Sequence, residues 1–67
     1  MDSAEIIITL KMLVDRNIID LDDVDGFYVG DTKCKGWEVY NCMNYKVIAI
    51  FPGVDKGTLT LDLQELK

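Results

Sequence analysis

Hydrophobic residues follow a helical spacing near the start of the chain and an alternating spacing over most of the rest. Between Ser3 and Arg16 the helical spacing predicts an amphipathic helix with one stripe facing the core. The stripe consists of Ile6, Ile7, Leu10, Leu13 and Val14. The same segment also alternates and contains three consecutive isoleucines, so a strand is the alternative interpretation. Its content of good helix formers and a capping Asp2 or Ser3 favour the helix.

The helix interpretation places Ile8 and Met12 on the side away from this stripe, one turn apart. Exposed hydrophobic residues on a helix can contact a partner or a second copy of the chain. We therefore predict Ile8 and Met12 as an oligomer contact. The alternative is ordinary exposure of two apolar side chains, which is common on protein surfaces.

Beyond Asn17, which suits a left-handed helix stop, Asp20 and Asp23 predict a single helical turn through Val24. The periodicity then changes to two, and β-branched and aromatic residues form four candidate strands separated by turns. These strands are 27–29, 37–41, 45–51 and 58–64. The third is apolar on both faces and is expected at the centre of the sheet, whereas the fourth alternates like a strand with one wet face.

We therefore expect an α+β fold in a single domain over residues 1–67. An N-terminal helix and a short second helical turn pack on a small antiparallel sheet of three to four strands, arranged as a meander. One helix covers one face of that sheet only, so the isoleucines of segment 45–51 need a second cover. The sheet can curl into a small barrel, or a second copy can cover it; the small core of a 67-residue chain favours a homodimer.

The chain carries 12 acidic and 7 basic residues, which gives a formal net charge of −5. Such a charge repels nucleic acids and anionic membranes, so we expect no direct contact with either. No hydrophobic run approaches the roughly 18 residues of a membrane span, and the acidic start does not resemble a signal peptide. Two cysteines fall below the disulfide density of small secreted proteins, which predicts a reducing, cytoplasmic setting.

The residues that catalysis usually needs are scarce. The chain lacks histidine, which excludes His-based triads and the usual acid-base catalyst at neutral pH. Cys34 lies between Lys33 and Lys35, but no histidine is available to activate its thiol. Two cysteines do not complete the four-ligand set of a structural zinc site. We therefore predict no enzymatic activity, no cofactor and no metal.

The segment from Asp20 to Asp31 holds five aspartates and no basic residue. It does not match the calcium-binding loop of an EF-hand. When Gly26 occupies the glycine position of that loop, Leu21 and Thr32 fall at its first and last positions, where oxygen ligands are essential. A designed calcium site is therefore not expected.

Acidic side chains beside aromatic rings can steer and then anchor a positively charged protein surface. The candidate partner-binding residues are Asp20, Asp22, Asp23, Asp25, Tyr28, Asp31, Trp37 and Tyr40. The alternative is a polar turn in which the aspartates cap a short helix and Phe27 belongs to the core.

Small size, acidity and the lack of catalytic groups suit a non-enzymatic protein-binding module that occupies the basic surface of a partner protein. An inhibitor or accessory factor of viral or mobile-element origin fits this description. A structural homo-oligomer subunit is one alternative. The other is a binder of a small phosphorylated ligand at a subunit interface, with rings that stack a base and cations that hold phosphate. The residues for that role are Trp37, Tyr40, Tyr45, Lys33, Lys35, Lys46 and Arg16.

Overall fold

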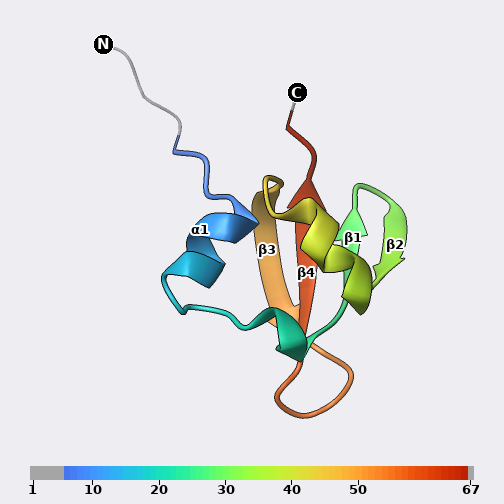
Figure 1. Cartoon of the computed structure of the whole chain (residues 1–67). Coiled ribbons are helices and arrows are strands. Elements are labelled where there is room, and N and C mark those ends of the chain that lie inside the picture. The colour runs from blue at the N-terminus through green and yellow to red at the C-terminus, as the bar shows by residue number, and fades with distance from the viewer. Residues whose placement is uncertain (1–5, 67) are drawn as a thin grey trace.

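A computed structural model describes residues 6–66 of the chain (Figure 1). The helical elements are the α-helix α1 (Leu10–Asp15) and the 3₁₀ helices η1 (Leu21–Asp23) and η2 (Gly36–Cys42). The strands are β1 (Val24–Val29), β2 (Thr32–Lys35), β3 (Lys46–Pro52) and β4 (Leu59–Gln64). The predicted α+β class, with an N-terminal helix, a short second helical turn and a small sheet, is confirmed.

The four strands form one sheet in the order β2-β1-β4-β3. The pairs β1 with β2 and β3 with β4 are antiparallel, but β1 and β4 run parallel to each other. The sheet is therefore mixed, which corrects the expectation of a wholly antiparallel meander. Parallel neighbours require a long connection, and the chain from β2 through η2 and β3 provides it.

The strand β3 lies at an edge of the sheet, not at its centre as predicted. Its apolar residues are not covered on both sides, since Ile48 and Ile50 are 48% and 41% exposed. The two inner positions belong to β1 and β4, and Leu61 of β4 is fully buried. The start of β3 is paired with the chain that precedes α1, because the Val47 N–H donates to the Ile8 carbonyl at 2.8 Å.

The helix α1 is shorter than the predicted helix because the chain before it pairs with β3. Thr9 forms a β-bridge with Lys46, and the preceding residues 6–8 are not helical. Ile6 and Ile7 are exposed and do not join the core stripe, whereas Leu10 is fully buried. The helix interpretation therefore holds only from Leu10 onwards, and β pairing before it is limited to an isolated bridge at Thr9. The predicted capping residues lie outside the described part of the chain; they are Asp2 and Ser3.

The prediction of a strand over 37–41 is wrong, because this segment belongs to η2. Val39 and Cys42 are buried three residues apart, which is the repeat of a 3₁₀ helix. A Cβ on Gly36 would collide with the backbone of Val24 and Asp25, so only glycine lets the helix start this close to β1. The preceding segment 32–35, which lies between two of the predicted strands, forms β2.

The core lies between the sheet and the helices α1 and η2, which cover the same face of the sheet (Figure 1). At its centre Phe27 of β1 and Leu61 of β4 are register partners, 1% and 0% exposed. The buried cluster consists of Leu10, Ile19, Leu21, Val24, Phe27, Val39, Cys42, Leu61 and Leu63. None of the helices in the described part of the chain is long and apolar enough to cross a membrane.

The Asp25 carboxylate links β1 to the β3–β4 hairpin by two hydrogen bonds. Its Oδ2 accepts a hydrogen bond from the Val54 N–H at 2.6 Å, and its Oδ1 accepts one from the Thr60 hydroxyl at 3.0 Å. The hydrogen bond from Val54 is the main cause that lowers the pKa of Asp25 below its ordinary value. Asp25 is therefore a structural carboxylate that prefers its charged form in the folded chain.

Phe27→Ala is expected to lower the free energy of unfolding by about 3–5 kcal/mol, because it removes a buried ring and leaves a cavity. Urea denaturation followed by circular dichroism measures the change. Val54→Ala serves as the control, since Val54 is 93% exposed and its truncation should cost less than about 0.5 kcal/mol. Equal losses in the two variants would contradict the assignment of Phe27 to the core.

Asp25→Asn is expected to make the fold less sensitive to acid. A pKa lowered from the ordinary 3.8 means that the Asp25 carboxylate stabilises the folded chain above that value. The contribution is lost as the pH falls through the lower pKa of the folded state. Urea denaturation at neutral pH and at about pH 3 should therefore show a smaller drop in stability for the variant than for the wild type.

Asp31→Asn is the matched control, because Asp31 is an exposed turn residue. It should retain the acid sensitivity of the wild-type chain. If Asp25→Asn lost as much stability between neutral and acidic pH as the wild type, the hydrogen bonds from Val54 and Thr60 would not stabilise the charged form of Asp25.

Candidate functional site

The helix η1 gathers three of the predicted carboxylates. Asp20 immediately precedes η1 and caps it, since its Oδ1 accepts a hydrogen bond from the Asp22 N–H at 3.0 Å. Asp22 and Asp23 lie in the first turn of η1 and are exposed. The predicted helical turn is thus confirmed, and capping accounts for the position of Asp20.

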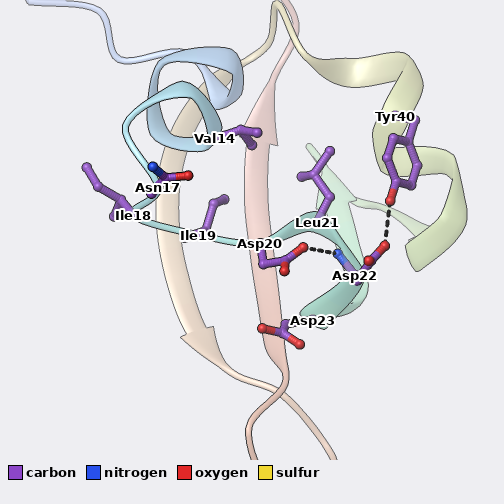
Figure 2. A pocket seen from close by; sticks show the side chains of 9 residues that line it. All are labelled: Val14, Asn17, Ile18, Ile19, Asp20, Leu21, Asp22, Asp23 and Tyr40. Carbon is purple, nitrogen blue, oxygen red and sulfur yellow. Dashed lines mark hydrogen bonds between the residues drawn. The ribbon is translucent and has the colours of Figure 1, made fainter.

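These carboxylates border an open pocket of about 580 Å³, which we call the η1 pocket (Figure 2). Its lining residues are Val14, Asn17, Ile18, Ile19, Asp20, Leu21, Asp22, Asp23 and Tyr40. Val14 of α1 and the isoleucines of the segment between α1 and η1 supply an apolar wall, and η1 with its cap supplies the charge. Hydrophobic and acidic groups therefore share one opening.

Tyr40 joins η2 to η1, because its hydroxyl donates a hydrogen bond to Asp22 Oδ1 at 2.7 Å (Figure 2). This hydrogen bond is the main cause that raises the pKa of Tyr40, and the charges of Asp22 and Asp20 act in the same direction. The side chain is nevertheless 55% exposed. The ring is thus held in place and still available for contact.

Trp37 lies one turn before Tyr40 in η2, and its side chain is 68% exposed. A smaller hollow of about 220 Å³ lies between Trp37, Tyr40 and the η1 residues. It is lined by Leu21, Asp22, Val24, Gly36, Trp37 and Tyr40. Five of the predicted contact residues therefore form one acidic and aromatic surface, which we call the η1–η2 surface. They are Asp20, Asp22, Asp23, Trp37 and Tyr40.

The three other predicted contact residues lie elsewhere. Asp25 is engaged with the hairpin between β3 and β4. Tyr28 of β1 is the register partner of Lys33 in β2 and of Asp62 in β4. Asp31 lies in the turn between β1 and β2, at the end of β1 away from η1. The aspartates of segment 20–31 therefore do not form one face, and the roles of these three residues stay predictions.

The predicted oligomer contact is not assembled on one helix face. Ile8 precedes α1 and is 42% exposed, whereas Met12 lies within α1 and is half-buried. The predicted spacing of one turn requires helix at both residues, so its geometric basis is absent. A contact at Ile8 and Met12 stays a prediction.

Sequence reasoning missed the apolar rim of the η1 pocket. Ile18 is 60% exposed, whereas the neighbouring Ile19 is buried. Asn17 has a φ of 58°, which confirms the left-handed helix stop. Both isoleucines line the η1 pocket, and Ile19 also belongs to the buried core.

The η1–η2 surface is suited to recognition of cations. Within residues 6–66 no salt bridge reaches its three carboxylates. The salt bridge between Lys11 and Asp15 lies within α1. No group of three or more potential metal ligands gathers in the described part of the chain. The thiols of Cys34 and Cys42 are free, and burial raises the pKa of Cys42, which disfavours a nucleophilic thiolate there.

Comparison with known proteins gives no relative from which a function can be transferred. No protein-family model matches the chain, and no match is found among curated proteins or solved structures. Functional inference therefore depends on the geometry of the η1–η2 surface.

Asp22→Asn is expected to lower the pKa of Tyr40 towards 10.0, because the charged acceptor that stabilises the protonated phenol is removed. Titration of tyrosinate absorbance measures the shift, and Tyr40→Phe identifies the part of the curve that belongs to Tyr40. Asp23→Asn is the matched control and should leave that part unchanged. A Tyr40 titration that is the same in wild type and Asp22→Asn would show that the hydrogen bond does not form in solution.

Proposed function

We propose that the chain is a non-enzymatic protein-binding module that occupies a basic surface of a partner protein. In this role it acts as an inhibitor or accessory factor. The observation that carries the proposal is the convergence of three carboxylates from η1 and its cap with two exposed rings from η2. The hydrogen bond between Tyr40 and Asp22 holds these two groups together.

A basic partner gains from this surface in two steps. The net charge of −5 attracts a positive surface at long range and raises the association rate. At contact, the carboxylates accept hydrogen bonds from arginine or lysine, and arginine can bind a carboxylate with two parallel bonds. The rings of Trp37 and Tyr40 then supply apolar contact area and a face for a guanidinium group.

The class of partner, the cellular location and the origin of the chain are proposed from its composition. Negative charge disfavours direct contact with nucleic acids and anionic membranes, so the partner is a protein. A basic protein whose own ligand is a nucleic acid is a suitable partner, because carboxylates can occupy the surface that phosphates would take. We place the chain in the cytoplasm on its low cysteine content, and its small size and acidity suit a viral or mobile-element factor.

The double variant Asp22→Lys, Asp23→Lys is expected to weaken partner binding by at least about tenfold, because it places like charges at the contact. Immobilised wild type and variant are compared for proteins retained from lysate of the source cells. A synthetic peptide of alternating arginine and alanine provides a defined probe, with anisotropy as the readout.

The matched control is Asp31→Lys, Asp55→Lys, which changes two exposed aspartates away from the η1–η2 surface. Both double variants change the net charge from −5 to −1, because each Asp to Lys change adds two charges. Selective loss in the first variant supports the site. Equal loss in both would mean that bulk charge, and not the η1–η2 surface, captures the partner.

A further inference from the structure

We propose that two copies of the chain associate about a two-fold axis that passes beside Trp37. The hollow that contains Asp22, the acidic hollow, lies in each copy against the hollow that contains Lys33 and Lys35, the basic hollow, of the other. The observation behind this proposal is the position of Trp37. Its indole is 68% exposed and lines two adjacent hollows. One hollow holds two lysines and one aspartate, whereas the only charged side chain of the other is Asp22. The inference does not depend on the proposed protein-binding function.

The basic hollow has a volume of about 630 Å³ and contains two lysines of β2. Lys33 and Lys35 are two residues apart in β2 and therefore project from the same face of the sheet. Asp25 also lines this hollow, but its carboxylate accepts hydrogen bonds from Val54 and Thr60. Two lysines against one carboxylate leave the hollow with a net positive charge.

The acidic hollow lies on the other side of the indole and contains Asp22 and the Tyr40 hydroxyl. Val24, Gly36 and Trp37 line both hollows, so the two are parts of one continuous surface. The close approach of Gly36 to the backbone of β1 fixes the start of η2, which carries Trp37. Positive charge, the Trp37 ring and negative charge therefore follow one another along this surface.

A surface with this order is complementary to itself. Rotation by half a turn about an axis beside Trp37 exchanges the two hollows, so Lys33 and Lys35 of each copy meet Asp22 of the other. Asp23 follows Asp22 in η1 and adds negative charge beside this contact. The same contact occurs twice, and the two indoles meet at its centre, where large aromatic residues contribute most to binding. Charge complementarity thus identifies a second copy as the occupant, because it supplies both signs in matching positions.

The net charge of −5 on each copy opposes this association at long range. We therefore expect a dimer that forms at high micromolar concentration and dissociates on dilution. In the dimer, Trp37 and Asp22 are covered, so a basic partner would compete with the second copy for the η1–η2 surface.

Sedimentation velocity over a range of protein concentrations measures the dimer, and fluorescence reports its location. Trp37 is the single tryptophan of the chain, so burial of its indole should shift the emission to shorter wavelength as the dimer forms. The variants Lys33→Glu, Lys35→Glu and Asp22→Lys, Asp23→Lys should each weaken self-association by at least about tenfold, since each places like charges across the interface.

An equimolar mixture of these two double variants provides the decisive measurement. In a mixed dimer, the glutamates introduced at positions 33 and 35 of one variant face the lysines introduced at positions 22 and 23 of the other. The unchanged lysines and aspartates also face each other, so association should return to wild-type strength or above. Circular dichroism and urea denaturation of each variant verify that it is folded.

Three outcomes would overturn the proposal. They are a monomer at all concentrations, self-association without a change in tryptophan emission, and a mixture that associates no better than its components. A dimer that survives both double variants but is lost in Ile8→Asp would place the contact at the exposed isoleucines instead. None of these outcomes bears on partner binding, which is measured with the arginine peptide.

Discussion

The parallel pairing of β1 with β4 is the constraint on which the rest of the structure depends. Phe27 and Leu61 are register partners in this pair and are almost completely buried. Without this pair, the hairpin of β1 and β2 has no contact with the hairpin of β3 and β4 inside the sheet. The pairing joins residues far apart in the sequence, so its entropic cost must be offset by the apolar contacts between the strands and the helices above them. Asp25 adds a polar connection between the same two hairpins.

The candidate site is built differently, from one continuous stretch of chain. The carboxylates come from η1 immediately before β1, and the rings come from η2 immediately after β2. The β1–β2 hairpin brings the two helices together, and the hydrogen bond between Tyr40 and Asp22, 18 residues apart, is the direct link. Local connections of this kind need little loop-closure entropy. The η1–η2 surface therefore owes its shape to the local hairpin, while α1, β3 and β4 contribute the core that holds the hairpin in place.

Sequence patterns predicted those parts of the fold in which periodicity and burial agree. The alternation in β4 and the cap of η1 correspond directly to structure, because Leu61 and Leu63 face the core and Asp20 binds the backbone of η1. The patterns failed where tertiary contacts determine the secondary structure. The β-prone residues of segment 37–41 form a 3₁₀ helix because Val39 and Cys42 share a core-facing side and Gly36 allows a close approach to β1. The isoleucines at 6–8 form neither the predicted helix nor the alternative strand, and all three are exposed.

The same distinction explains which part of the candidate site was predictable. Composition identified acidic residues and rings as the chemistry of the segment, but sequence spacing carries no information on which of them converge. Asp25 and Asp22 are three residues apart and differ in role, because one meets the backbone of the β3–β4 hairpin and the other meets only a phenol at the surface. A carboxylate with both oxygens engaged, as in Asp25, has less acceptor capacity for a partner than one that accepts a single hydrogen bond, as in Asp22. Hydrogen-bond satisfaction, and not the density of aspartates, therefore separates the structural carboxylates of this chain from those that a partner can reach.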